Sequence, residues 1–238
     1  MKKSEIAKSL DIKATALLGL AALTLLMNSI VNNITRAVSM PDVAENICAI
    51  FVSTVSIFTY VFAVKGFSNV NKACKLCEKN ENYYMGRNLT VFTVVCVVLG
   101  IILTVIALAF SVIISQYAAA EVLTPSDIQA RDNVLVITAI INIATQFCSI
   151  STPFIFYLWK IYKLTPANEK IGKFALLTVI VLVVHLVISV LNSVYSIRTA
   201  ENNFLPAFSS ILNTVKYIVL TAFFIVRKNY LLKIETEE

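Results

Sequence analysis

The chain has 238 residues, of which 58% are apolar and 14% are charged. Soluble domains usually have about half of their residues apolar and about a quarter charged, so this composition excludes an ordinary soluble fold. The formal net charge of +6 could indicate a nucleic-acid partner, but the basic residues are distributed along the chain in a pattern that indicates membrane topology instead.

Six apolar stretches explain the composition, and each is long enough to cross about 30 Å of hydrocarbon as a helix. They cover residues 14–34, 45–64, 90–117, 134–159, 174–197 and 205–226. Because lipid offers no hydrogen-bond partners to the backbone, apolar spans of this length form helices. The sequence therefore predicts an all-α, polytopic membrane bundle of six transmembrane helices, with residues 1–238 in a single domain.

Basic residues fall mainly on one side of this arrangement. Of the twenty Lys and Arg residues, sixteen lie in the two tails and in the second and fourth loops, and three lie on the opposite side. This bias predicts that both termini are cytoplasmic and that the protein sits in a plasma or inner membrane. The basic charge therefore sets the topology and can contact anionic lipid, and it implies no nucleic-acid partner.

The first stretch follows basic residues, as in a signal peptide, but its apolar run is long. No clean small-x-small cleavage pattern follows it, so we expect it to be retained. Its inner half is apolar, whereas its outer half carries Thr24, Asn28 and Asn32 at four-residue intervals on one helix face. The polar residues of this stretch thus gather toward the outside.

The second stretch is predicted to continue into the cytoplasm as an amphipathic helix, with Phe67, Val70, Cys74 and Cys77 on one face. A Cys-x-x-Cys pair can be a redox centre or half of a zinc site. The sequence has no second ligand pair, so we interpret these cysteines as small apolar residues on a helix face. The five cysteines suggest no disulfide framework, and we expect no metal site or cofactor.

The third stretch carries small residues at intervals of three or four residues, which places them on one stripe of the helix. They are Cys96, Gly100, Thr104, Ala107, Ser111 and Ser115. Small side chains let membrane helices approach closely, so we interpret this stripe as a packing seam.

The fourth stretch is preceded by Thr124-Pro125-Ser126-Asp127, a pattern typical of a helix start. We therefore expect the fourth helix to begin well outside the bilayer and to project outward. Pro153, inside the stretch, predicts a kink because proline removes a backbone hydrogen bond.

Three prolines, Pro41, Pro125 and Pro206, each open a helix that runs inward, at separations of 84 and 81 residues. This regularity fits three tandem helical hairpins of one ancestral type. It fits equally well the even spacing expected of any six-helix chain of this length, so both interpretations stay open.

The last hairpin holds the only histidine, His185, and the only charge deep within an apolar stretch, Lys216. His185 lies 12 residues from Lys173 and Lys216 lies 11 residues from Arg227, which correspond to roughly 18 Å and 16 Å of helical rise. The two helices are consecutive and antiparallel, so the two side chains are predicted to share a level near the midplane.

Further polar residues extend from that level toward the outside. Counted along the two helices, Ser189 matches Asn213, and Asn192 lies a turn further out. Gln146 falls near the midplane level and Asn142 lies further out, whereas the inner halves of the last two spans are almost entirely apolar. We therefore predict an outward-facing polar cavity closed on the cytoplasmic side by an apolar plug. The candidate ligand-binding residues are Lys216, His185, Gln146, Asn142, Asn192, Asn213 and Ser189.

Lys216 has no evident carboxylate partner, because no Asp or Glu lies in the core of any stretch. Ionisable residues within a membrane are costly and are candidates for function. Four interpretations stay open: a neutral amine, an ammonium solvated by the cavity, an ammonium that binds an anionic group, and one that snorkels or contacts backbone carbonyls.

The sequence offers little support for an enzyme. Ser189 lies one turn from His185, but the chain shows no Gly-flanked serine, carboxylate pair, metal-ligand cluster or phosphate-binding loop. The leading prediction is a non-enzymatic, transporter-like or channel-like protein that binds or passes a small polar or anionic solute. The alternative is an accessory, sensor or immunity protein whose helices contact other membrane proteins or further copies of itself. An intramembrane enzyme would need a catalytic acid or a metal from a partner chain.

Overall fold

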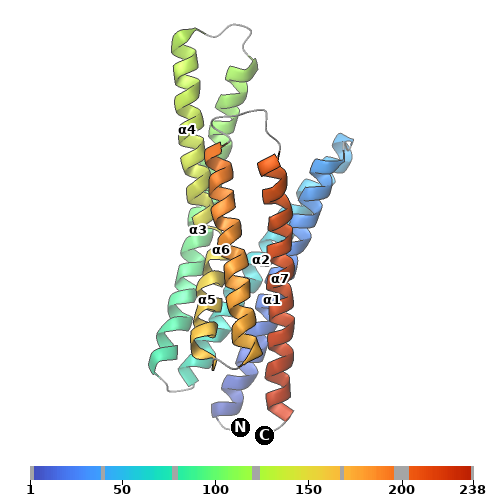
Figure 1. Ribbon diagram of the computed structural model, residues 1–238, viewed down its shortest axis with the longest axis vertical. Helices are drawn as coiled ribbons and strands as arrows, with labels where there is room; N and C mark the ends of the chain where they lie inside the picture. Colours follow the sequence, from blue (N-terminus) through green and yellow to red (C-terminus); the bar gives the residue numbers. More distant parts are fainter. Residues whose placement is uncertain are drawn as a thin grey trace.

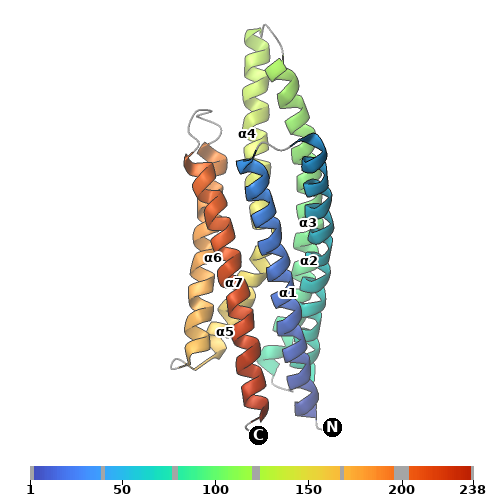
Figure 2. The same cartoon turned by 90° about the vertical axis from the view of Figure 1, so that its right-hand side faces the viewer.

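The computed structural model describes residues 3–38, 41–76, 80–119, 124–166, 169–195 and 204–236. The helices within these ranges are α1 (Lys3–Ala37), α2 (Asp42–Leu76), α3 (Asn80–Ala119), α4 (Pro125–Phe147), α5 (Ser151–Leu164), α6 (Lys170–Tyr195) and α7 (Phe204–Thr236). They run roughly along one long axis, and both termini lie at the same end (Figure 1, Figure 2). We call this the terminal end and the opposite one the far end.

Six helical units in the described ranges are long and apolar enough to cross a membrane, when α4 and α5 are taken together as one unit. This confirms the predicted all-α bundle of six spans, which is the architecture of a multi-pass membrane protein. Five of the six units are longer than the predicted spans, and the first two cover Glu5–Thr35 and Val43–Leu76. They are longer because an apolar window marks only the lipid-crossing part, whereas polar residues continue the helix at each end.

The fourth unit is broken between α4 and α5 rather than only kinked. Regular helix ends at Phe147 and resumes at Ser151, just ahead of Pro153. Proline has no backbone N–H, and its ring clashes with the carbonyl four residues earlier, so the chain departs from helical geometry around Ser149. The Ser149 carbonyl accepts from the Thr152 N–H at 3.1 Å instead, and the Thr152 hydroxyl donates to the Phe147 carbonyl at 2.7 Å. The predicted proline disturbance is confirmed, and it is larger than a kink.

The helices contact one another in a closed ring, in the order α1, α2, α3, α4, α6 and α7, with α7 returning to α1. α5 packs against α6 and also contacts α3. Consecutive helices pair as hairpins, α1 with α2, α3 with α4 and α6 with α7. The contact of α1 with α7 joins the two ends of the chain, which hairpin pairing does not by itself require.

The far-end parts of α3 and α4 extend beyond the other helices (Figure 1, Figure 2). α4 begins in a capping box, in which the Thr124 backbone N–H donates to Asp127 Oδ2 at 3.0 Å and the Asp127 N–H donates to Thr124 Oγ1 at 3.3 Å. Pro125 occupies the first turn, where a missing N–H costs no hydrogen bond. These observations confirm the predicted helix start and the projection of the fourth helix.

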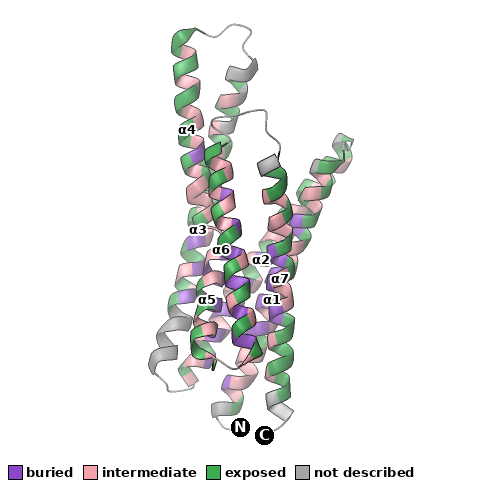
Figure 3. Ribbon diagram, in the orientation of Figure 1, coloured by how far each residue is buried: buried purple, intermediate pink, exposed green. Residues whose placement is uncertain are grey.

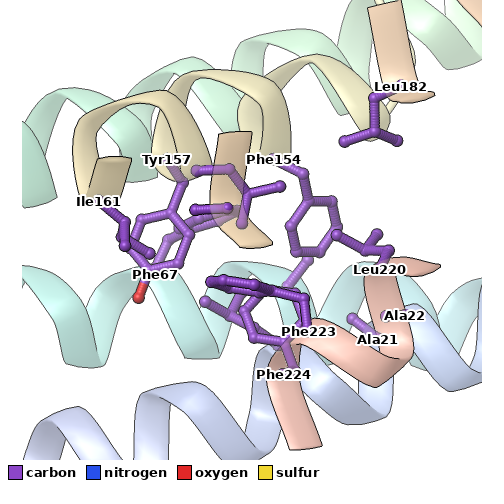
Figure 4. Close-up of a cluster of buried hydrophobic side chains, with 14 of the residues drawn as sticks. Ala21, Ala22, Phe67, Phe154, Tyr157, Ile161, Leu182, Leu220, Phe223 and Phe224 are labelled. Atoms are coloured by element: carbon purple, nitrogen blue, oxygen red, sulfur yellow. The ribbon is translucent and has the colours of Figure 1, made fainter. Parts of the chain in front are cut away.

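Buried residues gather in the half of the bundle nearer the termini (Figure 3). The largest are aromatic and interleave from α2, α5 and α7 (Figure 4). They are Phe67, Phe154, Tyr157, Phe223 and Phe224, which we call the aromatic core. Ring centroids are 5.6 Å apart for Phe67 and Phe154 and 6.3 Å apart for Tyr157 and Phe224, so the rings are in direct contact.

The surface of α2 and α3 is strongly apolar. Val43, Ile50 and Val105 are 71%, 68% and 61% exposed, and many other large apolar residues of these two helices are also exposed. Such a surface is stable in contact with lipid tails rather than with water. The bundle therefore faces the bilayer with these helices.

The stripe of small residues on α3 makes a close helix contact over part of its length. Cys96 is buried, and a Cβ at Gly100 would lie 3.3 Å from the carbonyl oxygen of Cys148. The predicted packing seam is confirmed at these two positions, where α3 meets the junction of α4 and α5. Thr104, further along the stripe, is exposed.

Candidate functional site

The candidate site is built around a contact between α6 and α7. Lys216 Nζ lies 3.0 Å from His185 Nδ1, and the two residues are 5% and 6% exposed. Both helices are long apolar elements that run in opposite directions. Their apolar surroundings offer few hydrogen-bond partners, so the two polar side chains contact each other. The predicted shared level of His185 and Lys216 is confirmed by this distance.

Ser189 completes the buried polar group from one turn further along α6. Its Oγ lies 3.3 Å from His185 Nε2 and 3.5 Å from Nδ1, and the residue is 6% exposed. An ammonium at Lys216 donates to Nδ1, which leaves the imidazole proton on Nε2, where it can donate to Ser189. If both groups were cationic, neither ring nitrogen could accept from Lys216, so the pair carries at most one positive charge.

Lys216 also lies against the ring of the next residue. Its Nζ is 4.5 Å from the Tyr217 ring centroid, a distance typical of a cation–π contact. The ion pairs in the described part of the chain join Arg131 to Asp132 and Arg227 to Asp11, and none includes Lys216. An ammonium at this position therefore has the Tyr217 ring and His185 beside it, and no carboxylate among the described residues.

The other predicted site residues are more dispersed. Asn213 turns away from α6 and donates to Ser29 Oγ on α1 at 2.9 Å. Gln146 and Asn192 are half-buried and Asn142 is exposed. The hydrogen bonds of the described residues connect none of these four to His185 or Lys216. The structure thus gathers three of the seven predicted residues, Lys216, His185 and Ser189, into one contact group.

A hydrogen-bonded contact between α1 and α7 was not anticipated from the sequence. Thr214 Oγ1 lies 2.9 Å from Ser29 Oγ and accepts from Asn33 Nδ2 at 2.8 Å, and Ser210 Oγ donates to Asn33 Oδ1. With Asn213, these residues form what we call the α1–α7 polar seam. The signal in the sequence is the spacing of polar residues by three or four on both helices, but nothing local pairs the first helix with the last.

The polar face of α1 that holds Thr24 and Asn28 contacts α2. Thr59 Oγ1 donates to Thr24 Oγ1 at 2.7 Å, and Asn28 Nδ2 donates to Ser56 Oγ at 2.9 Å. These residues therefore join two helices, as polar side chains often do in membranes. Asn32, the third residue predicted on this face, is exposed.

A second missed cluster lies at the terminal end. Arg227 Nη2 lies 3.1 Å from Asp11 Oδ2, and its Nε donates to Thr15 Oγ1 at 3.3 Å. The Arg227 guanidinium also lies 5.7 Å from the ring centroid of Tyr157. Arg227 was counted with the basic C-terminal tail and Asp11 was not singled out, although a charge of opposite sign near the same end of the first and last apolar stretches was a usable signal.

No group of three or more His, Cys, Asp or Glu residues that could hold a metal occurs among the described residues. Cys74 is half-buried on α2, while Cys77 lies outside the described residues. The predicted packing role of Cys74 agrees with its place on the helix face that also buries Phe67 and Val70.

Comparison with known proteins finds no match for this chain among protein-family models, curated proteins or solved structures. The site offers an amine, an imidazole and a hydroxyl in an apolar surrounding, a set of hydrogen-bonding groups that can hold a polar ligand.

Proposed function

We propose that this membrane protein binds or passes a small polar or anionic solute, without converting it chemically, at a site centred on Lys216 and His185. The buried 3.0 Å contact between the amine and the imidazole, which has no carboxylate partner among the described residues, carries the proposal. The solute enters from the far end, which the distribution of basic residues assigns to the outside.

The energetics of Lys216 support a binding role. A lysine at the bilayer centre costs about 2.5–3.5 kcal/mol on insertion scales, and simulations give larger values. An ammonium has three N–H donors, and His185 accepts only one of them. An anion brings both the missing charge and further acceptors, and charge-assisted hydrogen bonds are the strong ones.

Flux into proteoliposomes tests this function directly. Vesicles containing the purified protein are assayed with chloride, nitrate, formate and inorganic phosphate as probes. Lys216→Met is expected to lower flux or binding of the preferred anion at least tenfold, because one charged hydrogen bond is worth about 1.5–3 kcal/mol. Lys163→Gln is the matched control, since it removes a lysine that lies exposed on α5. Equal flux for Lys216→Met and the wild type would refute the proposal.

Access from the far end is tested by labelling. Single cysteines at Asn142, Asn192 and Asn213 are treated with a membrane-impermeant thiol reagent added from outside. A polar cavity predicts reaction at all three positions, and slower reaction when the transported anion is present. Lack of reaction at Asn192→Cys and Asn213→Cys, with reaction at the exposed Asn142→Cys, would speak against a cavity.

One observation favours the alternative, an accessory protein that acts through helix contacts. Several polar residues of the far-end half, Asn28, Ser29, Asn33 and Asn213, use their side chains to join helices. The alternative predicts that Lys216→Ala and His185→Ala leave function intact, whereas Gly100→Leu on the α3 seam abolishes it. Native mass spectrometry of protein released gently from membranes separates the two, because it reports a bound small molecule, a partner chain or a second copy.

A further inference from the structure

Four polar residues from three helices meet at the terminal end of the bundle. Arg227 of α7 pairs with Asp11 of α1 at 3.1 Å and donates to Thr15 at 3.3 Å, while its guanidinium lies 5.7 Å from the Tyr157 ring of α5. Arg227 follows Lys216 by 11 residues, which is roughly 16 Å along α7. The cluster is thus a separate group and does not touch the His185–Lys216 contact.

The hydrogen-bonding capacity of this cluster is only partly used. A guanidinium has five N–H donors, and the hydrogen bonds of the described residues involve Nε and Nη2 but not Nη1. The Tyr157 side chain is 1% exposed, and its hydroxyl has no hydrogen-bond partner of normal geometry in the described structure. Buried hydroxyls without a partner are rare and costly, so an acceptor placed between this donor and the partly used guanidinium would satisfy both groups.

The charged side chains of the cluster are partly exposed at the terminal end, whereas the Tyr157 hydroxyl is buried behind them. The side chains of Arg227 and Asp11 are 15% and 29% exposed, whereas Lys216 is 5% exposed. Leu220, Phe223 and Phe224 lie between Lys216 and Arg227 on α7 and are fully buried. α7 therefore carries one cationic group on each side of the aromatic core.

We propose that Arg227 and Tyr157 form a second binding station for a small oxyanion, open to the terminal end. Asp11 occupies the guanidinium when the station is empty, because a carboxylate has the same charge and the same paired oxygens as the ligand. The station rests on the proposed function only in that it binds the same class of solute as Lys216. An anion that moves past the aromatic core therefore leaves Lys216 and can bind Arg227.

Formate is the probe that tests this station, because it is the smallest carboxylate and matches the planar guanidinium. The protein in detergent is treated with phenylglyoxal, and the adducts at Arg227 and Arg131 are measured separately by peptide mass spectrometry. Formate is expected to protect Arg227 from modification. Arg131, on α4 at the far end, is the internal control and is expected to keep its reactivity.

Variants separate the station from a purely structural ion pair. Asp11→Asn removes the competing carboxylate and is expected to lower the formate concentration for half-protection about tenfold. Tyr157→Phe removes one donor and is expected to raise that concentration severalfold, and it keeps the test decisive if Asp11→Asn does not fold. Lys216→Met is expected to leave the formate protection of Arg227 unchanged. A failed test of anion binding at Lys216 can therefore be distinguished from a failed test at Arg227.

Two results would overturn the proposal. Formate that protects neither the wild type nor Asp11→Asn would show that Arg227 binds no anion. Asp11→Asn that only lowers the unfolding temperature, with the same half-protection concentration as the wild type, would show that the ion pair is a clamp between α1 and α7.

Discussion

Gly66 of α2 lies so close to Leu18 of α1 that a Cβ at position 66 would sit 2.7 Å from Leu18 Cδ2 and 2.8 Å from its Cγ. Leu18 is fully buried and belongs to the same buried cluster as Phe67. The leucine side chain therefore has little freedom to move aside. The two helices approach at this point because position 66 has no side chain, as small residues allow in membrane bundles.

Gly66→Ala is accordingly expected to destabilise the protein by about 1–3 kcal/mol, the usual cost of overpacking a well-filled core. Unfolding in detergent mixtures with increasing dodecyl sulfate, followed by circular dichroism, measures this change. Gly19→Ala is the matched control, because its Cβ would meet Phe224 Cβ at 3.2 Å and needs a smaller adjustment. If Gly66→Ala combined with Leu18→Ala costs the full sum of the two single changes, the clash is not the cause.

The α1–α7 polar seam gives a second prediction. Asn33→Ala removes the hydrogen bonds to Thr214 and Ser210 and is expected to lower the free energy of unfolding by about 0.5–2 kcal/mol, as for other interhelical hydrogen bonds in membranes. The neighbouring Asn32→Ala makes the same chemical change at an exposed position and is expected to have little effect. Equal losses from the two variants would mean that the seam contributes nothing to stability.

The features that could be predicted from the sequence are those that depend on local periodicity and on the position of a residue along its own helix. Six apolar windows predicted six spans, and counting residues from the basic ends placed His185 and Lys216 at one level, because helical rise is constant and consecutive helices are antiparallel. The Thr124 capping box was also predicted, since both of its partners lie within four residues of each other.

The parts that the sequence did not predict depend on which distant helices meet. The α1–α7 polar seam joins residues more than 170 positions apart in the sequence. Asp11 and Arg227, which form an ion pair, are also more than 170 positions apart. No local pattern selects α1 rather than α6 as the partner of Asn213, because α7 has polar residues facing both neighbours. The predicted ladder matched Asn213 with Ser189 by level alone, and in the structure the Asn213 side chain donates to Ser29 of α1, whereas Lys216 meets His185 at the predicted level.

The orientation of the bundle in the membrane gives a third prediction. In a variant without native cysteines, Ser126→Cys is placed at the start of α4, and Lys170→Cys at the start of α6. The excess of basic residues at the terminal end predicts that, in intact cells, an impermeant maleimide reacts with Ser126→Cys only. Lys170→Cys is expected to react after permeabilisation. The reverse pattern would place the termini outside, and the candidate site would then open toward the cytoplasm.

The final prediction concerns the balance between stability and binding at Lys216. His185→Leu leaves an amine buried beside an apolar residue and is expected to destabilise the protein by about 1–3 kcal/mol, the cost of a buried polar group without its partner. Replacing both residues, with His185→Leu and Lys216→Met together, leaves no orphaned group. The double variant is expected to be as stable as the wild type or more stable by about 1–3 kcal/mol, because it also removes the cost of a lysine within the bilayer.

The same dodecyl sulfate titration measures all four members of this double-mutant cycle. Lys163→Met controls for the general effect of adding an apolar residue, because Lys163 is exposed and contacts only the Trp159 ring, at 5.3 Å, among the contacts described for it. A double variant that gains stability but loses anion binding would mean that the polar pair serves binding at the expense of stability. A double variant much less stable than either single one would mean that Lys216 and His185 hold the bundle together, and the binding role would lose its main support.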